Sequence, residues 1–132
     1  MRFEAKGEPT FVAICHCADC RRAAGAPFVH WVGFERTAVG FTSEPRLRPG
    51  ARRVTRGFCD GCGTTLSYAD ADLPLDEVYL SGGAFDDPVA VPPTRHAYWS
   101  ERLAFVALAD DLPKFEGFSR QRVGGPEPER VA

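Results

Sequence analysis

Residues 11–25 read FVAICHCADCRRAAG, and this stretch decides how the chain folds and what it can bind. Four apolar residues precede Cys15, which predicts a buried strand that ends at the first cysteine. A short helix is predicted over residues 18–24, because an acidic residue near its start, two arginines near its end and a following glycine suit a helix. The turn between strand and helix lets three thiols converge, those of Cys15, Cys17 and Cys20.

Converging thiols indicate a zinc site. Thiolate sulfur suits Zn²⁺, a borderline-soft ion that imposes no geometry of its own, and a helix N-terminus lowers the pKa of a thiol toward the form that binds metal. A second cluster lies at Cys59-Asp60-Gly61-Cys62, where glycine permits the tight backbone of a zinc knuckle. The sequence therefore predicts that the five cysteines are metal ligands and not disulfide partners.

Two arrangements of these thiols remain open. Spacing favours a closed tetrahedral site made of Cys17, Cys20, Cys59 and Cys62, with Cys15 left in the core. The alternative is a site of Cys15, Cys17 and Cys20 whose fourth position is open to water or to an incoming thiol. An open position is the feature that distinguishes catalytic zinc from structural zinc.

The composition is that of an ordinary globular domain. The 132 residues are 44% hydrophobic and 26% charged, so we expect one core and neither a disordered nor a fibrous architecture. A formal net charge of -2 argues against a protein that wraps nucleic acid. We find no signal-like apolar run and no stretch long enough to span a bilayer. We therefore expect a cytoplasmic protein, in a reducing compartment where structural disulfides are rare.

The density of turn-forming residues predicts a mainly β fold. With 13 Gly and 11 Pro spread along the chain, little room is left for long helices. Candidate strands, chosen by alternation and β-propensity, are residues 2–6, 11–15, 28–35, 53–58, 65–68, 77–80, 96–99 and 103–108. Residues 45–51 read as a loop. We expect a single domain over residues 1–120 and a flexible tail over residues 121–132.

The residues around both clusters carry a family resemblance. The segments are Cys15-His16-Cys17-x-x-Cys20-Arg21-Arg22-x-x-Gly25-Ala26-Pro27-Phe28 and Gly57-Phe58-Cys59-x-x-Cys62-Gly63-Thr64-x-Leu66. Together with residues 93–96 and 110–115, this pattern resembles the family of the glutathione-dependent formaldehyde-activating enzyme and centromere protein V. The resemblance extends over nearly the whole chain, from Arg2 to about Phe118.

The resemblance implies a β-tent of folded antiparallel sheets and a carbon–sulfur lyase activity that condenses glutathione with formaldehyde to S-hydroxymethylglutathione. It implies that Cys15, Cys17 and Cys20 hold the reactive zinc. In the family's pattern, Cys59 and Cys62 complete a structural zinc begun by an N-terminal Cys-x-Cys. That Cys-x-Cys is not in this sequence, and one hypothesis is that translation starts further upstream.

Other polar residues are candidates for supporting roles. Arg21 and Arg22 are predicted to hold a glutathione carboxylate, because a guanidinium pairs with two oxygens at once. Strand alternation should point His16 away from the neighbouring thiols. His30 lies between apolar residues and is predicted to be packed and hydrogen-bonded, while His96 is a candidate for the pocket wall.

The partners expected from these features are small molecules, glutathione and an aldehyde. A basic run of five arginines is interpreted as a solvated face and not as a nucleic-acid contact, because no aromatic residues interleave it. These arginines are Arg46, Arg48, Arg52, Arg53 and Arg56. The alternative function is a non-catalytic binding module, in which zinc only stabilises a small β fold.

Overall fold

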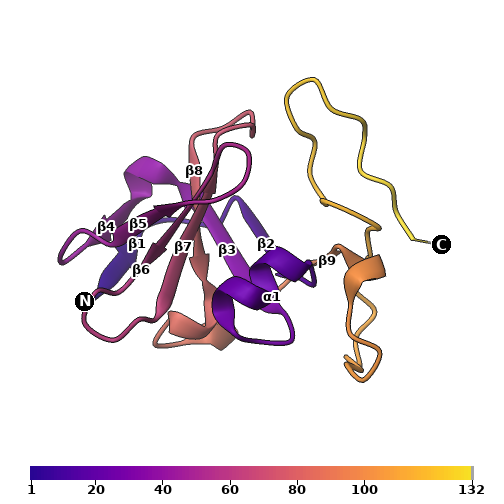
Figure 1. Cartoon of the computed structure of the whole chain (residues 1–132), viewed down its shortest axis with the longest axis horizontal. Coiled ribbons are helices and arrows are strands. Elements are labelled where there is room, and N and C mark those ends of the chain that lie inside the picture. Colours follow the sequence, from indigo (N-terminus) through magenta and orange to yellow (C-terminus); the bar gives the residue numbers. More distant parts are fainter. Residues whose placement is uncertain (132) are drawn as a thin grey trace.

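A seven-stranded sheet forms the centre of the computed structural model, which describes residues 1–131. The strands lie in the order β5-β6-β7-β8-β3-β2-β9 (Figure 1). Neighbouring strands are antiparallel except β2 and β9, which run parallel. Their bounds are β2 (Phe11–Cys15), β3 (Val29–Glu35), β5 (Arg46–Pro49), β6 (Val54–Phe58), β7 (Thr65–Asp70), β8 (Glu77–Ser81) and β9 (His96–Ala97). The predicted mainly β fold of antiparallel sheets is confirmed.

A second, two-stranded sheet covers one face of the central sheet. It pairs β1 (Phe3–Ala5) with β4 (Val39–Phe41). Apolar side chains of these strands pack against Val12, Val32, Phe34 and Leu80 of the central sheet, and Val32 and Leu80 have no exposed surface. This contact buries one face of β2, β3 and β8, which makes it the first half of the core.

The opposite face of the same three strands carries the second half of the core. Because successive residues of a strand point to opposite faces, Phe11, Ala13 and Cys15 of β2 lie on this side with Trp31 of β3 and Tyr79 of β8. The only α-helix of the described residues, α1 (Ala18–Ala24), packs beside them. The cysteine cluster thus lies at the border between core and helix.

Helix α1 begins and ends as the sequence predicts. Cys17 is its N-cap, and the Cys17 sulfur accepts a hydrogen bond from the Cys20 backbone N–H at 3.3 Å. Gly25 ends the helix in the left-handed conformation, with φ of 62°, which glycine adopts without steric cost. The predicted bounds of residues 18–24 are confirmed.

The C-terminal segment extends the fold on the β9 side of the sheet, drawn orange to yellow in Figure 1. The His96 N–H donates to the Pro113 carbonyl at 2.8 Å, and the Phe115 N–H donates to the His96 carbonyl at 3.0 Å. Further along, the Val131 N–H donates to the Lys114 carbonyl at 2.8 Å. The stretch expected to be a flexible tail therefore makes backbone hydrogen bonds as far as Val131.

Single turns of 3₁₀-helix lie between strands and after the last strand. They are η1 (Arg36–Ala38), η2 (Gly82–Ala84), η3 (Pro88–Ala90) and η4 (Trp99–Glu101). Within residues 1–131, no helix is long and apolar enough to cross a membrane.

Some strand predictions were wrong. Residues 103–108 form no strand, because the Val106 N–H closes a turn onto the Leu103 carbonyl at 2.9 Å and Phe105 is 78% exposed. The predicted strand 96–99 stops after two residues, where Tyr98 takes up a positive φ of 56°. Strands β4 and β5 were missed, and β5 lies within the stretch interpreted as a loop. Its four residues are all exposed, so they carry no buried apolar alternation to mark a strand.

Candidate metal centre and its pocket

Three cysteine sulfurs gather where β2 meets α1. Cys15 is the last residue of β2, Cys17 is the helix N-cap and Cys20 lies in the first helical turn. Their sulfur atoms all lie within 4.8 Å of one another. Cys15 and Cys20 are buried and Cys17 is half-buried. This is the convergence that the Cys-x-Cys-x-x-Cys spacing predicts.

Cys20 receives hydrogen bonds from two side chains outside the motif. The indole Nε1–H of Trp31 donates to its sulfur at 3.4 Å, and the Arg56 Nη2 donates at 3.6 Å. The thiols of Cys15 and Cys17, followed by Arg56, lower the pKa of the Cys20 thiol far below its ordinary value. The pKa of the Cys15 thiol is raised, because that thiol is a hydrogen-bond donor to Cys17 and Cys20 and is buried. The N–H groups of Trp31 and Arg56 thus favour the deprotonated form of Cys20.

The chemistry of this donor set fits a metal ion. Three sulfur ligands within 4.8 Å of each other match the number and type of ligands that bind soft or borderline divalent ions. Three thiolates at such a distance repel one another unless a cation lies between them. Cys15, Cys17 and Cys20 can therefore hold a metal ion.

The second cluster is arranged differently. Cys59 is buried and Cys62 is exposed on a turn in which the Gly63 N–H donates to the Cys59 carbonyl at 2.8 Å. The Cys62 sulfur lies 3.0 Å from the Thr64 hydroxyl, and hydrogen bonding from Thr64 lowers the pKa of the Cys62 thiol to about 7. Among residues 1–131, Cys15, Cys17 and Cys20 form the only group of three or more potential ligands. The closed four-thiol set is thus not assembled in this structure.

A pocket of about 880 Å³ opens beside the three-cysteine cluster. All three cysteines line it, and seven aromatic side chains contribute to its wall, those of Phe11, Trp31, Phe58, Tyr68, Tyr79, Tyr98 and Phe118. Five arginines also line it, namely Arg22, Arg48, Arg52, Arg56 and Arg122, against the acidic Asp19 and Glu101. A volume in this range suits a small organic ligand, and the excess of arginine favours a negatively charged one.

Two of the pocket arginines face each other across a strand pair. Arg48 of β5 and Arg56 of β6 are directly opposite partners, so their side chains lie on the same face of the sheet. The Arg56 guanidinium lies over the Tyr68 ring at 5.0 Å from its centroid. Like charges at opposite positions destabilise a strand pair, whereas an anion placed between them removes that cost. The basic run interpreted as a solvated face thus supplies part of the pocket.

The predicted glutathione-binding arginines occupy different places. Arg22 is exposed and lines the pocket. The Arg21 Nε donates to the His16 carbonyl at 3.2 Å, and Arg21 is not part of the pocket lining. Arg56 and Trp31, which contact the cluster directly, were missed by sequence reasoning. The β6 strand was predicted, but its position relative to α1 was not, so nothing in the sequence placed Arg56 beside Cys20.

His16 and His96 form a buried pair that is not part of the three-cysteine group. His16 is fully buried, and its Nε2 lies 3.0 Å from the Nδ1 of His96. The Nε2 of His96 lies 3.0 Å from an Asp110 carboxylate oxygen. Burial, and then the charge of His96, lower the pKa of His16 to about 4. His96 is thus a link in a buried chain and not a pocket residue, which corrects its predicted role.

The fold and site together define a mainly β protein that presents a three-thiol cluster for a metal ion at the wall of a cationic, aromatic pocket. A sequence model of the family described as glutathione-dependent formaldehyde-activating enzyme matches residues 1–101. The chain belongs to this family. A comparison with curated proteins found no match.

Proposed function

We propose that this protein is a zinc-dependent enzyme of the carbon–sulfur lyase type, which joins glutathione to formaldehyde as an S-hydroxymethyl adduct. The observation that carries the proposal is the position of Cys15, Cys17 and Cys20, whose sulfurs lie within 4.8 Å of one another on the wall of the pocket. Family membership relates the chain to glutathione and formaldehyde. The sulfur cluster adds a place where a thiol can be activated.

Cys15, Cys17 and Cys20 would hold the zinc, which when bound supplies an open coordination position that lowers the pKa of an entering thiol. Arg56 and Trp31 keep the Cys20 sulfur in its ligating, deprotonated form by donating N–H groups to it. The aromatic wall supplies apolar surface around the place where the groups would react. In the reaction the thiol S–H adds across the C=O bond: a C–S bond forms, and the proton ends on the former carbonyl oxygen.

The pocket arginines are suited to the carboxylates of glutathione. Arg48 and Arg56 lie opposite each other on the pocket face of β5 and β6, and a carboxylate between them would form charge-assisted hydrogen bonds with both. Arg22 lines the same pocket from α1. The proposed carboxylate-binding set is therefore Arg22, Arg48 and Arg56, and Arg21 lies outside the pocket lining.

Cys59 and Cys62 stay candidates for a second, structural zinc. Their turn presents one buried and one exposed sulfur, which is half of a four-ligand site. The proposal also places the protein in a reducing compartment, the cytoplasm, because its chemistry requires free thiols.

The experiment is to measure zinc per chain and the rate of adduct formation in the wild type, Cys15→Ser and Cys62→Ser. We expect Cys15→Ser to lose one zinc and the acceleration over the spontaneous reaction, because it removes a ligand of the reactive site. Cys62→Ser should keep the acceleration. A wild type that holds zinc without accelerating the reaction is instead a binding module, and unchanged zinc in Cys15→Ser would exclude the three-cysteine site.

A further inference from the structure

We propose that residues 118–122, here called the wall segment, form a fixed outer wall of the pocket and limit the size of the thiol that can reach the cysteine cluster. The segment lies beyond residues 1–101, the part matched by the family. The role of the wall segment as a size limit for a thiol substrate rests on the proposed function. The attachment of the segment to the sheet is argued only from its ion pairs and hydrogen bonds.

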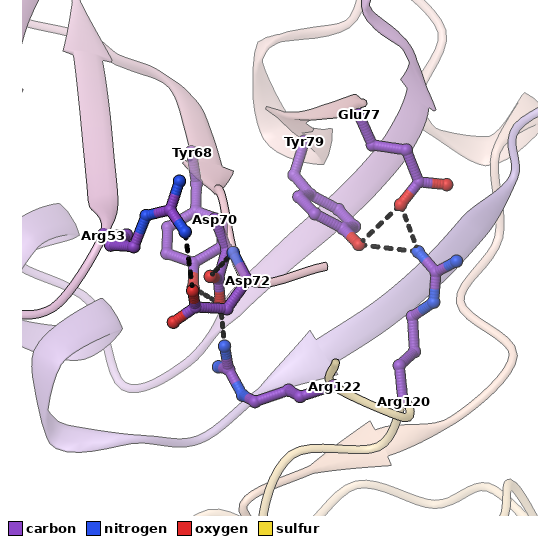
Figure 2. Close-up of polar contacts among 8 residues, drawn as sticks. All are labelled: Arg53, Tyr68, Asp70, Asp72, Glu77, Tyr79, Arg120 and Arg122. Atoms are coloured by element: carbon purple, nitrogen blue, oxygen red, sulfur yellow. Dashed lines mark hydrogen bonds and ion pairs between the residues drawn. The ribbon is translucent and has the colours of Figure 1, made fainter. Parts of the chain in front are cut away.

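The first attachment is to the start of β8. The Arg120 Nη1 pairs with a Glu77 carboxylate oxygen and lies 2.6 Å from the Tyr79 hydroxyl. The Tyr79 hydroxyl donates to the same Glu77 oxygen at 3.0 Å. Figure 2 shows the three groups closing a triangle. Each member therefore has two polar partners.

The second attachment repeats this pattern on β7. The Arg122 Nη1 pairs with an Asp70 carboxylate oxygen, to which the Tyr68 hydroxyl donates at 3.2 Å (Figure 2). Tyr68 and Tyr79 are opposite partners in the β7–β8 pair. The two arginines, two residues apart in the wall segment, thus reach two acids held by adjacent strands.

Burial makes these attachments strong. The Glu77 and Asp70 side chains have no exposed surface, while those of Arg120 and Arg122 are 17% and 22% exposed. A carboxylate that is withdrawn from water and then loses its cation is strongly destabilised. Release of the wall segment would leave the buried Glu77 and Asp70 carboxylates without their arginine partners. The attached position of the wall segment is therefore favoured.

The wall segment contributes two side chains to the pocket lining, Phe118 and Arg122. The Arg122 guanidinium lies over the Phe118 ring at 4.3 Å from its centroid, and the Phe118 and Tyr98 rings are 6.5 Å apart. Ion pairing therefore fixes Arg122, and Arg122 in turn supports Phe118. The result is a wall that narrows the space available beside the cysteine cluster.

The test measures access to the cluster without requiring catalysis. Purified full-length protein is alkylated with iodoacetamide or with the much larger fluorescein maleimide, and the modified Cys17 peptide is quantified by mass spectrometry. The ratio of the two rates at Cys17 cancels the intrinsic reactivity of its sulfur. Exposed Cys62, which is outside the pocket lining, is the internal reference.

Phe118→Ala should raise the rate ratio of large to small reagent at Cys17 several-fold, because it removes the wall side chain and leaves both ion pairs intact. The matched control is Phe105→Ala, since Phe105 is 78% exposed in the same C-terminal region and is not part of the lining. It should leave the ratio unchanged. An unchanged ratio in Phe118→Ala would overturn the proposal.

The attachment is tested by the double variant Asp70→Asn with Arg122→Gln, which removes the charge pair without leaving a buried charge unpaired. The Val123 N–H donates to the Asp72 carbonyl at 3.1 Å, so its hydrogen exchange reports release of the adjoining wall. We expect faster exchange at Val123 together with a raised rate ratio at Cys17. Unchanged exchange would show that this ion pair does not hold the wall.

The readouts also separate this proposal from the proposed function. If the protein accelerates no thiol–aldehyde reaction but the labelling ratio responds as expected, the size limit set by the wall segment is supported and the proposed enzymatic function is rejected. If the protein is catalytic and the labelling ratio does not respond, only the size limit is rejected.

Discussion

Gly82, the first residue of η2, lies against the imidazole ring of His30. A Cβ atom on Gly82 would overlap that ring. Gly82 is buried and does not adopt a positive φ, so the lack of a side chain is required for space and not for backbone conformation. This contact seats η2 on β3.

Gly82→Ala should therefore destabilise the fold by about 1–3 kcal/mol, the usual cost of overpacking a filled site. The matched control is Gly83→Ala, because a Cβ at the neighbouring Gly83 meets nothing within 4 Å and surface changes of this kind stay within about 0.5 kcal/mol. Urea unfolding of both variants checks the difference. Equal free energies of unfolding would show that η2 moves freely away from β3.

His30 should make stability depend on pH. Burial lowers the pKa of His30 below its ordinary value of 6.5, against a smaller opposing effect of a hydrogen bond with the Val91 backbone. The unfolded chain then binds a proton more readily than the folded chain, so stability is complete above about pH 6.5 and falls as the pH drops below it. Between pH 7.5 and 5.5, the free energy of unfolding measured in urea should fall less in His30→Gln than in the wild type. An identical fall in the two proteins would contradict the assignment to His30.

Arg56 should strengthen metal binding, because it donates to the Cys20 sulfur at 3.6 Å and offsets the charge of a thiolate ligand. Replacement of a residue that hydrogen-bonds a ligand typically weakens metal affinity about 10–100-fold. We expect a weakening of this size in Arg56→Gln, measured by competition for zinc with a chromophoric chelator. Arg48→Gln is the control, since Arg48 lines the same pocket without contacting a cysteine sulfur in the described chain. Equal affinities in the two variants would exclude the role of Arg56.

The local parts of the site could be predicted from the sequence, and the distant parts could not. Residues 11–25 contain their own signals: an apolar run, a thiol spacing that folds on one turn, and a glycine at the helix end. The structure confirms the strand and the helix within these residues. Their order along the chain is enough to bring three sulfurs together.

Arg56, Trp31 and Arg122 reach the pocket through sheet pairing and long-range ion pairs. Arg56 of β6 contacts Cys20 of α1 across 36 residues of sequence, and no periodicity within β6 encodes that placement. Arg122 belongs to the C-terminal stretch that is expected from the sequence to be a flexible tail. Its attachment depends on a buried carboxylate 52 residues away in sequence, a distance that local patterns do not bridge.

Asp110 anchors the buried histidine chain from the C-terminal segment. Its carboxylate accepts hydrogen bonds from the His96 Nε2 at 3.0 Å and from the Leu112 N–H at 3.0 Å. Asp110→Ala leaves a ring nitrogen of the fully buried His96 without its partner. We expect a loss of about 2 kcal/mol in the free energy of unfolding, typical of a buried hydrogen bond to a charged group.

Asp111→Ala is the matched control for Asp110→Ala, because Asp111 is exposed and its carboxylate forms no ion pair with residues 1–131. It should change stability by less than about 0.5 kcal/mol. Guanidinium unfolding at pH 7 compares the two variants. If Asp110→Ala lowered the free energy of unfolding no more than Asp111→Ala, the His16–His96 pair would not need the Asp110 carboxylate. The hydrogen bonds of β9 to the C-terminal segment would then be enough to fix the His96 ring.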